Sequence, residues 1–322
     1  RTVAIGNNAL DAQNSSTDSN MYNVGVGYAA GGAITTGTQN TLIGGQAGDA
    51  LTDADHNVAV GYAALTADTL GSKSVAIGRA ALFTQNFTTA TDAYNVVVGY
   101  NAGLSVTTGK ENTIVGGLAF DANTVGERNV AIGYKAQSSD VGGWKTVAIG
   151  HGALENQNFS TATDSFNVAV GHSAGNDVTT GTRNVLMGAL AGDASTTGSR
   201  NNAIGYNALG ADTKGERATA LGYGALQTQN FTTATENYNV ALGYNAGGSV
   251  TVGVQNTFLG ALAGDSITDS DFNVAIGYGA LSEDTLGDRS IAIGHNALTL
   301  QNFTTSTQVF NTAIGHNVGA SI

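Results

Sequence analysis

The sequence predicts an all-β fold, a parallel β-solenoid of about eighteen short coils, from three observations. A nine-residue phrase of the type NVAIGYGAL, found at residues 273–281, recurs eighteen times along the 322 residues. Its copies follow one another at only two spacings, the shorter as from Gly27 to Gly44 and the longer as from Gly6 to Gly27. The shorter coil has no room for a useful helix together with two strands, so each coil is expected to hold two short strands and two turns.

The glycine of the phrase defines the period. One long spacing of twenty-one positions is followed by three short spacings of seventeen, and this order repeats along the chain. Four coils, as from Gly6 to Gly78, therefore make one super-period. Such regularity is typical of a solenoid in which each unit buries its apolar face against its neighbours. We expect one continuous repeat region over residues 1–322, a segment of a longer fibre. The phrase glycines are Gly6, Gly27, Gly44, Gly61, Gly78, Gly99, Gly116, Gly133, Gly150, Gly171, Gly188, Gly205, Gly222, Gly243, Gly260, Gly277, Gly294 and Gly315.

The residues around this glycine predict the backbone of the coil. The position directly before it is aliphatic or Met in every copy, and the position three before it is Val, Ile or Thr in seventeen. Period-two spacing of such residues indicates a strand, and we expect these two positions to face inward. The glycine then ends the strand in a turn that other residues resist. Ala three residues after the glycine, in seventeen copies, predicts a second strand packed closely against the first.

Asn stands four residues before the glycine in thirteen copies. In a stacked solenoid an Asn at a fixed turn predicts a ladder of side-chain amides that hydrogen-bond along the axis. The five exceptions recur once per super-period and are Thr2, Ser74, Thr146, Ala218 and Ser290.

The middle position of the strand predicts self-association. It is Ala in twelve copies and never polar, so the strand is apolar on both faces, as in a sheet covered on both sides. One coil has only one interior, and we therefore expect parallel copies of the chain to cover the second face. The bulky residues that recur at this position once per super-period are the expected interface residues: Leu42, Ile114, Leu186 and Phe258.

The phrases SVAIG at 74–78 and NVAIG at 129–133 and 273–277, each followed by Ala three residues on, carry a family resemblance. They resemble the head repeats of trimeric autotransporter adhesins of the YadA type and are similar to repeats of phage tail-fibre proteins. The resemblance spans essentially the whole chain. It implies a left-handed β-roll of three parallel chains and a role in adhesion or receptor binding. The coils are longer than is typical of those heads, and the four-coil super-period is unusual there.

Every fourth connection is four residues longer, as in QNFTTATDAYN at 85–95, and four of the five such connections carry two aromatic residues. Two interpretations are open. The loops protrude and touch a receptor or glycan, or the aromatics fasten the loop onto the coil, which is the favoured interpretation. In the first copy, at 13–23, Ser15 replaces the first aromatic. The residues concerned are Phe87, Tyr94, Phe159, Phe166, Phe231, Tyr238, Phe303 and Phe310.

Few residues suggest a ligand or a reaction. Asp53, Asp55, Asp269 and Asp271 are candidate calcium ligands, although Val stands where an EF-hand loop needs Gly. Every candidate acid, base or hydroxyl belongs to a set of equivalent copies, whereas catalysis needs a unique constellation. Four of the five histidines take the position after the phrase glycine, where other coils have Tyr, and are expected to stack on the surface: His151, His172, His295 and His316. We expect no enzyme and no cofactor beyond calcium.

Composition narrows the function further. The net charge of −12 argues against nucleic-acid binding, and the apolar runs are too short to span a bilayer. The sequence has no cysteine, which excludes disulfides and thiolate sites. The expectation is a trimeric rod of a phage tail fibre or bacterial surface adhesin, located outside the cell, on its surface or on a virion, that spaces or presents parts which bind a glycan or protein receptor. The alternative is a monomeric ice- or polysaccharide-binding solenoid, suggested by paired threonines such as Thr35 and Thr36.

Overall fold

The predicted parallel β-solenoid of about eighteen coils is confirmed. The computed structural model describes residues 1–14 and 20–321, which form strands and turns but no helix. Each phrase forms one strand of three residues that ends directly before the phrase glycine. In the described ranges, no helix has the length and hydropathy to cross a membrane.

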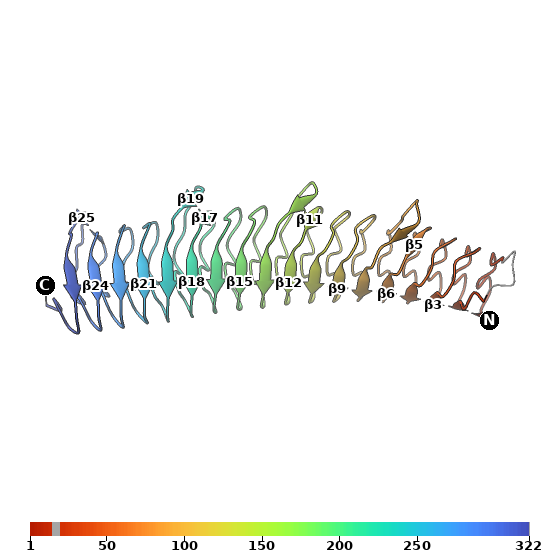
Figure 1. The fold of residues 1–322 in the computed structure, drawn as a ribbon, viewed down its shortest axis with the longest axis horizontal. Coiled ribbons are helices and arrows are strands. Elements are labelled where there is room, and N and C mark those ends of the chain that lie inside the picture. Colours follow the sequence, from red (N-terminus) through yellow and green to blue (C-terminus); the bar gives the residue numbers. More distant parts are fainter. Residues whose placement is uncertain (15–19, 322) are drawn as a thin grey trace. The chain divides into compact units, whose positions relative to one another are not determined.

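The chain divides into two compact units, and the first comprises Arg1–Ser165. Neighbouring phrase strands lie side by side in chain order in this unit (Figure 1), and all pair in parallel with the same register. The middle residue of each strand therefore lies beside the middle residue of the next strand, as Ala59 lies beside Ala76. The strands are β1 (Val3–Ile5), β2 (Val24–Val26), β3 (Thr41–Ile43), β4 (Val58–Val60), β6 (Val75–Ile77), β8 (Val96–Val98), β9 (Thr113–Val115), β10 (Val130–Ile132) and β12 (Val147–Ile149).

The second unit, Phe166–Ile322, repeats this arrangement. Its phrase strands also pair in parallel and in register, each with the next along the chain. They are β14 (Val168–Val170), β15 (Val185–Met187), β16 (Asn202–Ile204), β18 (Thr219–Leu221), β20 (Val240–Leu242), β21 (Thr257–Leu259), β22 (Val274–Ile276), β24 (Ile291–Ile293) and β26 (Thr312–Ile314).

The longer connections add pairs of two-residue strands that extend beyond the other turns (Figure 1). Each pair joins the long connection to the corresponding turn of the preceding coil, so the loop is held against that coil. The pairs are β5 (Gly71–Ser72) with β7 (Thr91–Asp92), β11 (Gly143–Trp144) with β13 (Thr163–Asp164), β17 (Gly215–Glu216) with β19 (Thr235–Glu236), and β23 (Gly287–Asp288) with β25 (Thr307–Gln308). The first long connection includes residues 15–19, so the prediction for Ser15 lies outside the described residues.

The facing of the strands is the reverse of the prediction. The middle residue points into the coil, and the residues before and after it point outward, as the burial of β4 shows for Val58, Ala59 and Val60. Both alternating sets are apolar, so period-two spacing alone cannot choose between them. Size decides, because the narrow interior of so short a coil accepts Ala at most positions and leaves the β-branched residues outside.

The predicted interface residues are therefore wrong. Leu42, Ile114, Leu186 and Phe258 are at most 1% exposed and lie inside the coil. Their recurrence reflects an exchange of volume within the core. A Cβ on Gly48 would stand 2.9 Å from Leu42 Cδ2, and a Cβ on Gly264 would come still closer to the Phe258 ring. Glycine thus clears the space that each bulky residue fills.

The predicted second strand is also wrong for most coils. The Ala three residues after the glycine is buried, as expected of a close contact, but it lies in a turn. The residues on either side of it have positive φ, for example 56° at Ala63 and 54° at Leu65, which interrupts an extended strand. These turns stack on one another instead, and the Leu65 N–H donates to the Ala81 carbonyl at 3.0 Å.

The phrase glycine is required for two reasons. At Gly61 the φ angle is 132°, which L-residues with a side chain rarely adopt. A Cβ there would also stand 2.5 Å from the carbonyl oxygen of Gly78 in the next coil. The predicted role of this glycine in the turn is confirmed.

Candidate interaction surface

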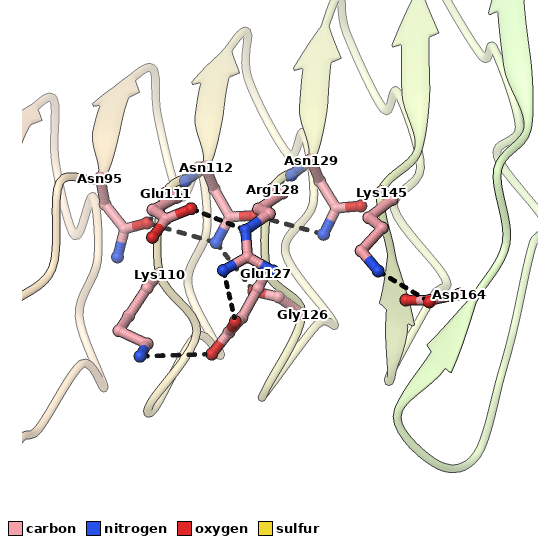
Figure 2. A network of polar contacts seen from close by, with 10 residues as sticks. All are labelled: Asn95, Lys110, Glu111, Asn112, Gly126, Glu127, Arg128, Asn129, Lys145 and Asp164. Atoms are coloured by element: carbon pink, nitrogen blue, oxygen red, sulfur yellow. Dashed lines mark hydrogen bonds and ion pairs between the residues drawn. The ribbon is translucent and has the colours of Figure 1, made fainter.

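The buried asparagines form the predicted ladder and belong to the framework that positions the surface. Asn95, Asn112 and Asn129 lie in a row inside successive coils (Figure 2). The Asn112 N–H donates to Asn95 Oδ1 at 3.0 Å, and its Nδ2 donates to the Gly126 carbonyl at 2.8 Å. Each Asn thus satisfies backbone groups of the coil that follows.

The ladder is interrupted once per super-period, and a buried Asp–Gln pair takes over at the base of the four long connections from 85–95 onward. Asp68 Oδ1 accepts the N–H groups of Gly71 and Phe87, both at 3.0 Å, and its Oδ2 accepts Gln85 Nε2 at 2.6 Å. Gln85 Oε1 accepts Asn95 Nδ2 at 2.8 Å, which restarts the ladder. Burial raises the pKa of Asp68, and the same cause raises the pKa of its counterpart Asp212.

The two aromatic residues of each long connection have different environments. Phe87, Phe159 and Phe231 are buried, and Phe303 is half-buried, so the first ring fastens the loop as the favoured interpretation expects. The second ring is exposed in every described copy: Tyr94, Phe166, Tyr238 and Phe310.

The outward side chains of the phrase strands form an apolar surface along each unit, which we call the outer face. It consists of the residues one and three positions before each phrase glycine. Exposed fractions reach 66% at Ile314. The large apolar residues that it exposes are Val3, Ile5, Ile43, Ile77, Val96, Val115, Met187, Leu221, Val240, Leu242, Leu259, Ile291 and Ile314. Contiguous exposed apolar surface is typical of a site of interaction, so the outer face is a candidate for one.

A column of rings borders the outer face just beyond the phrase glycine, and we call it the ring column. Tyr206, Tyr223 and Tyr244 stack in successive coils with centroids 5.2 and 5.4 Å apart. His295 stacks between Tyr278 and His316 at 5.4 and 5.0 Å, which confirms the predicted stacking role for these histidines. In every super-period one position of the column is small: Gly45, Gly117, Ala189 and Ala261.

The opposite end of the phrase strands carries a second column, five residues before each glycine, which we call the basic column. All its described members from Tyr22 onward have positive φ, between 51° and 63°. It holds eight of the twelve Lys and Arg residues of an acidic chain: Arg1, Lys73, Arg128, Lys145, Arg183, Arg200, Arg217 and Arg289. Its remaining members are Tyr22, Gln39, His56, Tyr94, Glu111, Phe166, Tyr238, Gln255, Phe272 and Phe310.

Cations of the basic column bind acidic and aromatic groups of neighbouring coils. Lys73 Nζ lies 2.6 Å from Asp92 Oδ2 and 5.1 Å from the centre of the Tyr94 ring. The hydrogen bond from Lys73 lowers the pKa of Asp92. Arg289 lies over the Phe272 ring at 4.6 Å. Further ion pairs join Arg128 to Glu111, Lys145 to Asp164 (Figure 2), Arg200 to Glu216 and Arg217 to Glu236.

The candidate calcium ligands bind turns of the preceding coil. Asp53 Oδ1 accepts Thr36 Oγ1 at 2.6 Å, Asp55 Oδ1 accepts the Thr38 N–H at 2.6 Å, and Asp271 Oδ1 accepts the Val254 N–H at 2.8 Å. Burial, together with the charges of Asp288 and Asp269, raises the pKa of Asp271. Among the described residues no group of three or more His, Asp or Glu side chains is placed to hold a metal. Calcium binding remains a prediction.

Sequence reasoning missed the basic column as a whole. The recurrence of Arg1, Lys73, Lys145, Arg217 and Arg289 once per super-period is visible in the sequence, but Arg128, Arg183 and Arg200 fall in other coils. When all coils are aligned on the phrase glycine, these cations all fall five residues before it, and this alignment would have revealed the column. Comparison of the chain with family models, with curated proteins and with solved structures finds no match.

Proposed function

We propose that this chain is a non-enzymatic segment of a homo-oligomeric extracellular fibre, at a cell surface or on a virion, that spaces or presents receptor-binding parts. The outer face carries the proposal. A coil that needed only its own interior could carry polar residues outside, yet the position before the glycine is aliphatic or Met throughout. Parallel, in-register strands align these side chains into one surface in each unit. The resemblance to YadA-type heads and tail fibres favours a trimer.

The alternative, a monomeric ice- or polysaccharide-binding solenoid, has less support. Its threonines would need free hydroxyls on a flat surface. The Thr35 hydroxyl donates to the Thr52 carbonyl at 3.2 Å, and Thr107 and Thr179 donate in the same way to Thr124 and Thr196. These hydroxyls serve to join coils.

Light scattering on the purified chain tests the proposal. We expect a molar mass three times the 32.3 kDa of one chain. Substitution of Leu221 and Leu242 by Glu places charges on the outer face and should give a monomer, because burial of an unpaired charge is costly. The matched control substitutes Glu at Thr232 and Ala234, which are exposed on a long connection, and should keep the mass. A monomeric wild-type chain contradicts the proposal and leads to assays of thermal hysteresis and glycan binding.

A further inference from the structure

We propose that the copies associate in parallel and in register, with the basic column of one copy packed against the ring column of the next. The partner is thus a second copy of this chain, and the inference rests on the proposed function. Two different borders of the outer face are then in contact, and each coil lies level with the same coil of the neighbouring copy. Three features of the columns carry it: their position, their charge and their size.

The first feature is the position of the two columns on opposite sides of the outer face. The basic column lies five residues before the phrase glycine and the ring column one residue after it, so the phrase strand separates them and they border the outer face on its two sides. Two copies that face one another with strand stacks running in the same direction bring unlike borders together. Copies running in opposite directions bring like borders together. The composition of the borders therefore distinguishes the two arrangements.

Charge favours unlike borders. Antiparallel copies would bring two basic columns together, each with eight cations and a single carboxylate, Glu111, and like charges at short range repel. Parallel copies in register would place five of the eight cations against a tyrosine or histidine, where a cation over a ring is attracted. This pairing already occurs within the chain, where Arg79 lies 5.3 Å from the centre of the Tyr100 ring and Arg217 lies 5.6 Å from that of Tyr238.

Size fixes the register. Where the ring column is small, at Gly45, Gly117, Ala189 and Ala261, the basic column of the same coil carries a long, non-aromatic side chain. These residues are Gln39, Glu111, Arg183 and Gln255. In the next coil toward the N-terminus both columns carry a ring, for example Tyr238 with Tyr244. An in-register contact places each long side chain where the neighbouring copy lacks a ring.

Two coils depart from this pattern. In the first coil Arg1 would meet Asn7, which is neither a ring nor a small residue. Lys73 and Arg79 have the same charge and would meet in register. Lys73 is already paired with Asp92 at 2.6 Å, and Arg79 Nη1 donates to Asn101 Oδ1 at 3.0 Å. Both cations therefore have partners within their own chain.

Cysteine cross-linking tests the inference cleanly, because the chain has no cysteine of its own. The main variant combines Gln255→Cys with Ala261→Cys in one coil. The strand β21 separates these positions, so they are too far apart for an intrachain disulfide, which needs Cα atoms within about 7 Å. Oxidation should convert most of the protein to a covalent closed ring of the mass found by light scattering.

Three controls make the result specific. Gln255→Cys alone and Ala261→Cys alone should stay uncross-linked. Gln255→Cys with Tyr278→Cys, which is one coil out of register, should cross-link at least tenfold less. A second pair, Gln39→Cys with Gly45→Cys, covers a folding failure of the first, since a Cβ at Gly45 has its nearest neighbour at 3.6 Å. A variant is used only if its circular dichroism spectrum and its oligomeric mass before oxidation match those of the wild type.

The outcomes separate this inference from the proposed function. Dimers from a single variant would show that like borders meet and would overturn it, as would cross-linking of the offset pair. An oligomer by light scattering in which neither in-register pair cross-links overturns the edge pairing and leaves the fibre proposal standing. A monomeric wild-type chain overturns both.

Discussion

At the residue scale, a side chain that recurs in successive coils stabilises the fold through hydrogen bonds to the adjacent coils. Asn112 provides the acceptor for the Asn129 N–H at 3.0 Å and the donor for the Gly126 carbonyl at 2.8 Å. Asn112→Ala leaves both groups buried without these partners, at a cost of about 1–3 kcal/mol each. We expect a clear loss of stability in denaturant or thermal unfolding.

The neighbouring substitution Glu111→Ala is the control. Glu111 also contacts the next coil, but its partner Arg128 is exposed, and exposed ion pairs contribute little. Its unfolding curve should overlay that of the wild type. Equal effects of the two substitutions would contradict a stabilising role for the ladder.

The buried aspartates predict a pH dependence. Burial holds the pKa of Asp212 above its ordinary value of 3.8, so the folded chain binds this proton more tightly than the unfolded chain does. The resulting stability is fully present below pH 3.8 and is lost as pH rises through the raised pKa. In Asp212→Asn this group no longer titrates. The Tm of the wild type minus that of the variant should therefore be largest in acid and decrease as the pH is raised past 3.8.

Asp92→Asn is the control of opposite sign. The hydrogen bond from Lys73 lowers the pKa of Asp92, so its contribution is present above pH 3.8 and lost as pH falls through the lowered value. A Tm difference for Asp212→Asn that increases with pH would contradict the assignment. It would mean that the three donors around this carboxylate outweigh its burial.

At the element scale, the sequence predicts the existence and spacing of the coils but not which way each strand faces. The spacing of Gly61 and Gly78 alone fixes the length of a coil, and the strand before each glycine follows from its aliphatic residues. With Val58, Ala59 and Val60 all apolar, no contrast of polarity marks the inward side. Only the cross-section of the coil, a property of the folded chain, excludes the larger residues.

The same limit applies to the candidate surface. A second apolar face, and hence self-association, is predictable from the strands. Its members are not, because Leu42 and Phe258 resemble interface residues until their contacts with Gly48 and Gly264 are known. The sequence also does not show which aromatic ring of a long connection is buried, since the exposed and the buried ring of a pair are alike in the sequence.

The buried ring of each long connection should control the mobility of that loop. Phe231 is 5% exposed and Tyr238 is 46% exposed. Phe231→Ala removes a buried ring, a change that costs about 3–5 kcal/mol in a core, so residues 229–239 should open more often. We expect hydrogen exchange in this loop to accelerate by roughly tenfold or more, since about 1.4 kcal/mol corresponds to a factor of ten. Tyr238→Ala should leave exchange of the loop unchanged, and equal acceleration in both variants would contradict the anchoring role.

At the scale of the whole chain, the super-period reflects core packing, because each bulky middle residue of a strand recurs together with the glycine that leaves space for it. In a solenoid each coil contacts only its neighbours, so stability is a sum over adjacent pairs. Leu186 needs the glycine at the end of its own phrase, because a Cβ on Gly192 would stand 2.7 Å from Leu186 Cδ2. Removal of residues 189–260, one whole super-period, brings Gly264 to the place of Gly192. Removal of residues 189–205, one coil, brings Leu209 there.

Length and packing therefore predict opposite orders of stability for the two deletions. A sum over coils alone favours the one-coil deletion, which keeps more coils. Packing favours the super-period deletion, because Leu209 against Leu186 overfills the interior at a cost of about 1–3 kcal/mol. We expect thermal unfolding to give the super-period deletion the higher Tm. Leu209→Gly in the one-coil deletion should recover most of the difference, and failure of this rescue would show that the period has no packing origin at Leu186.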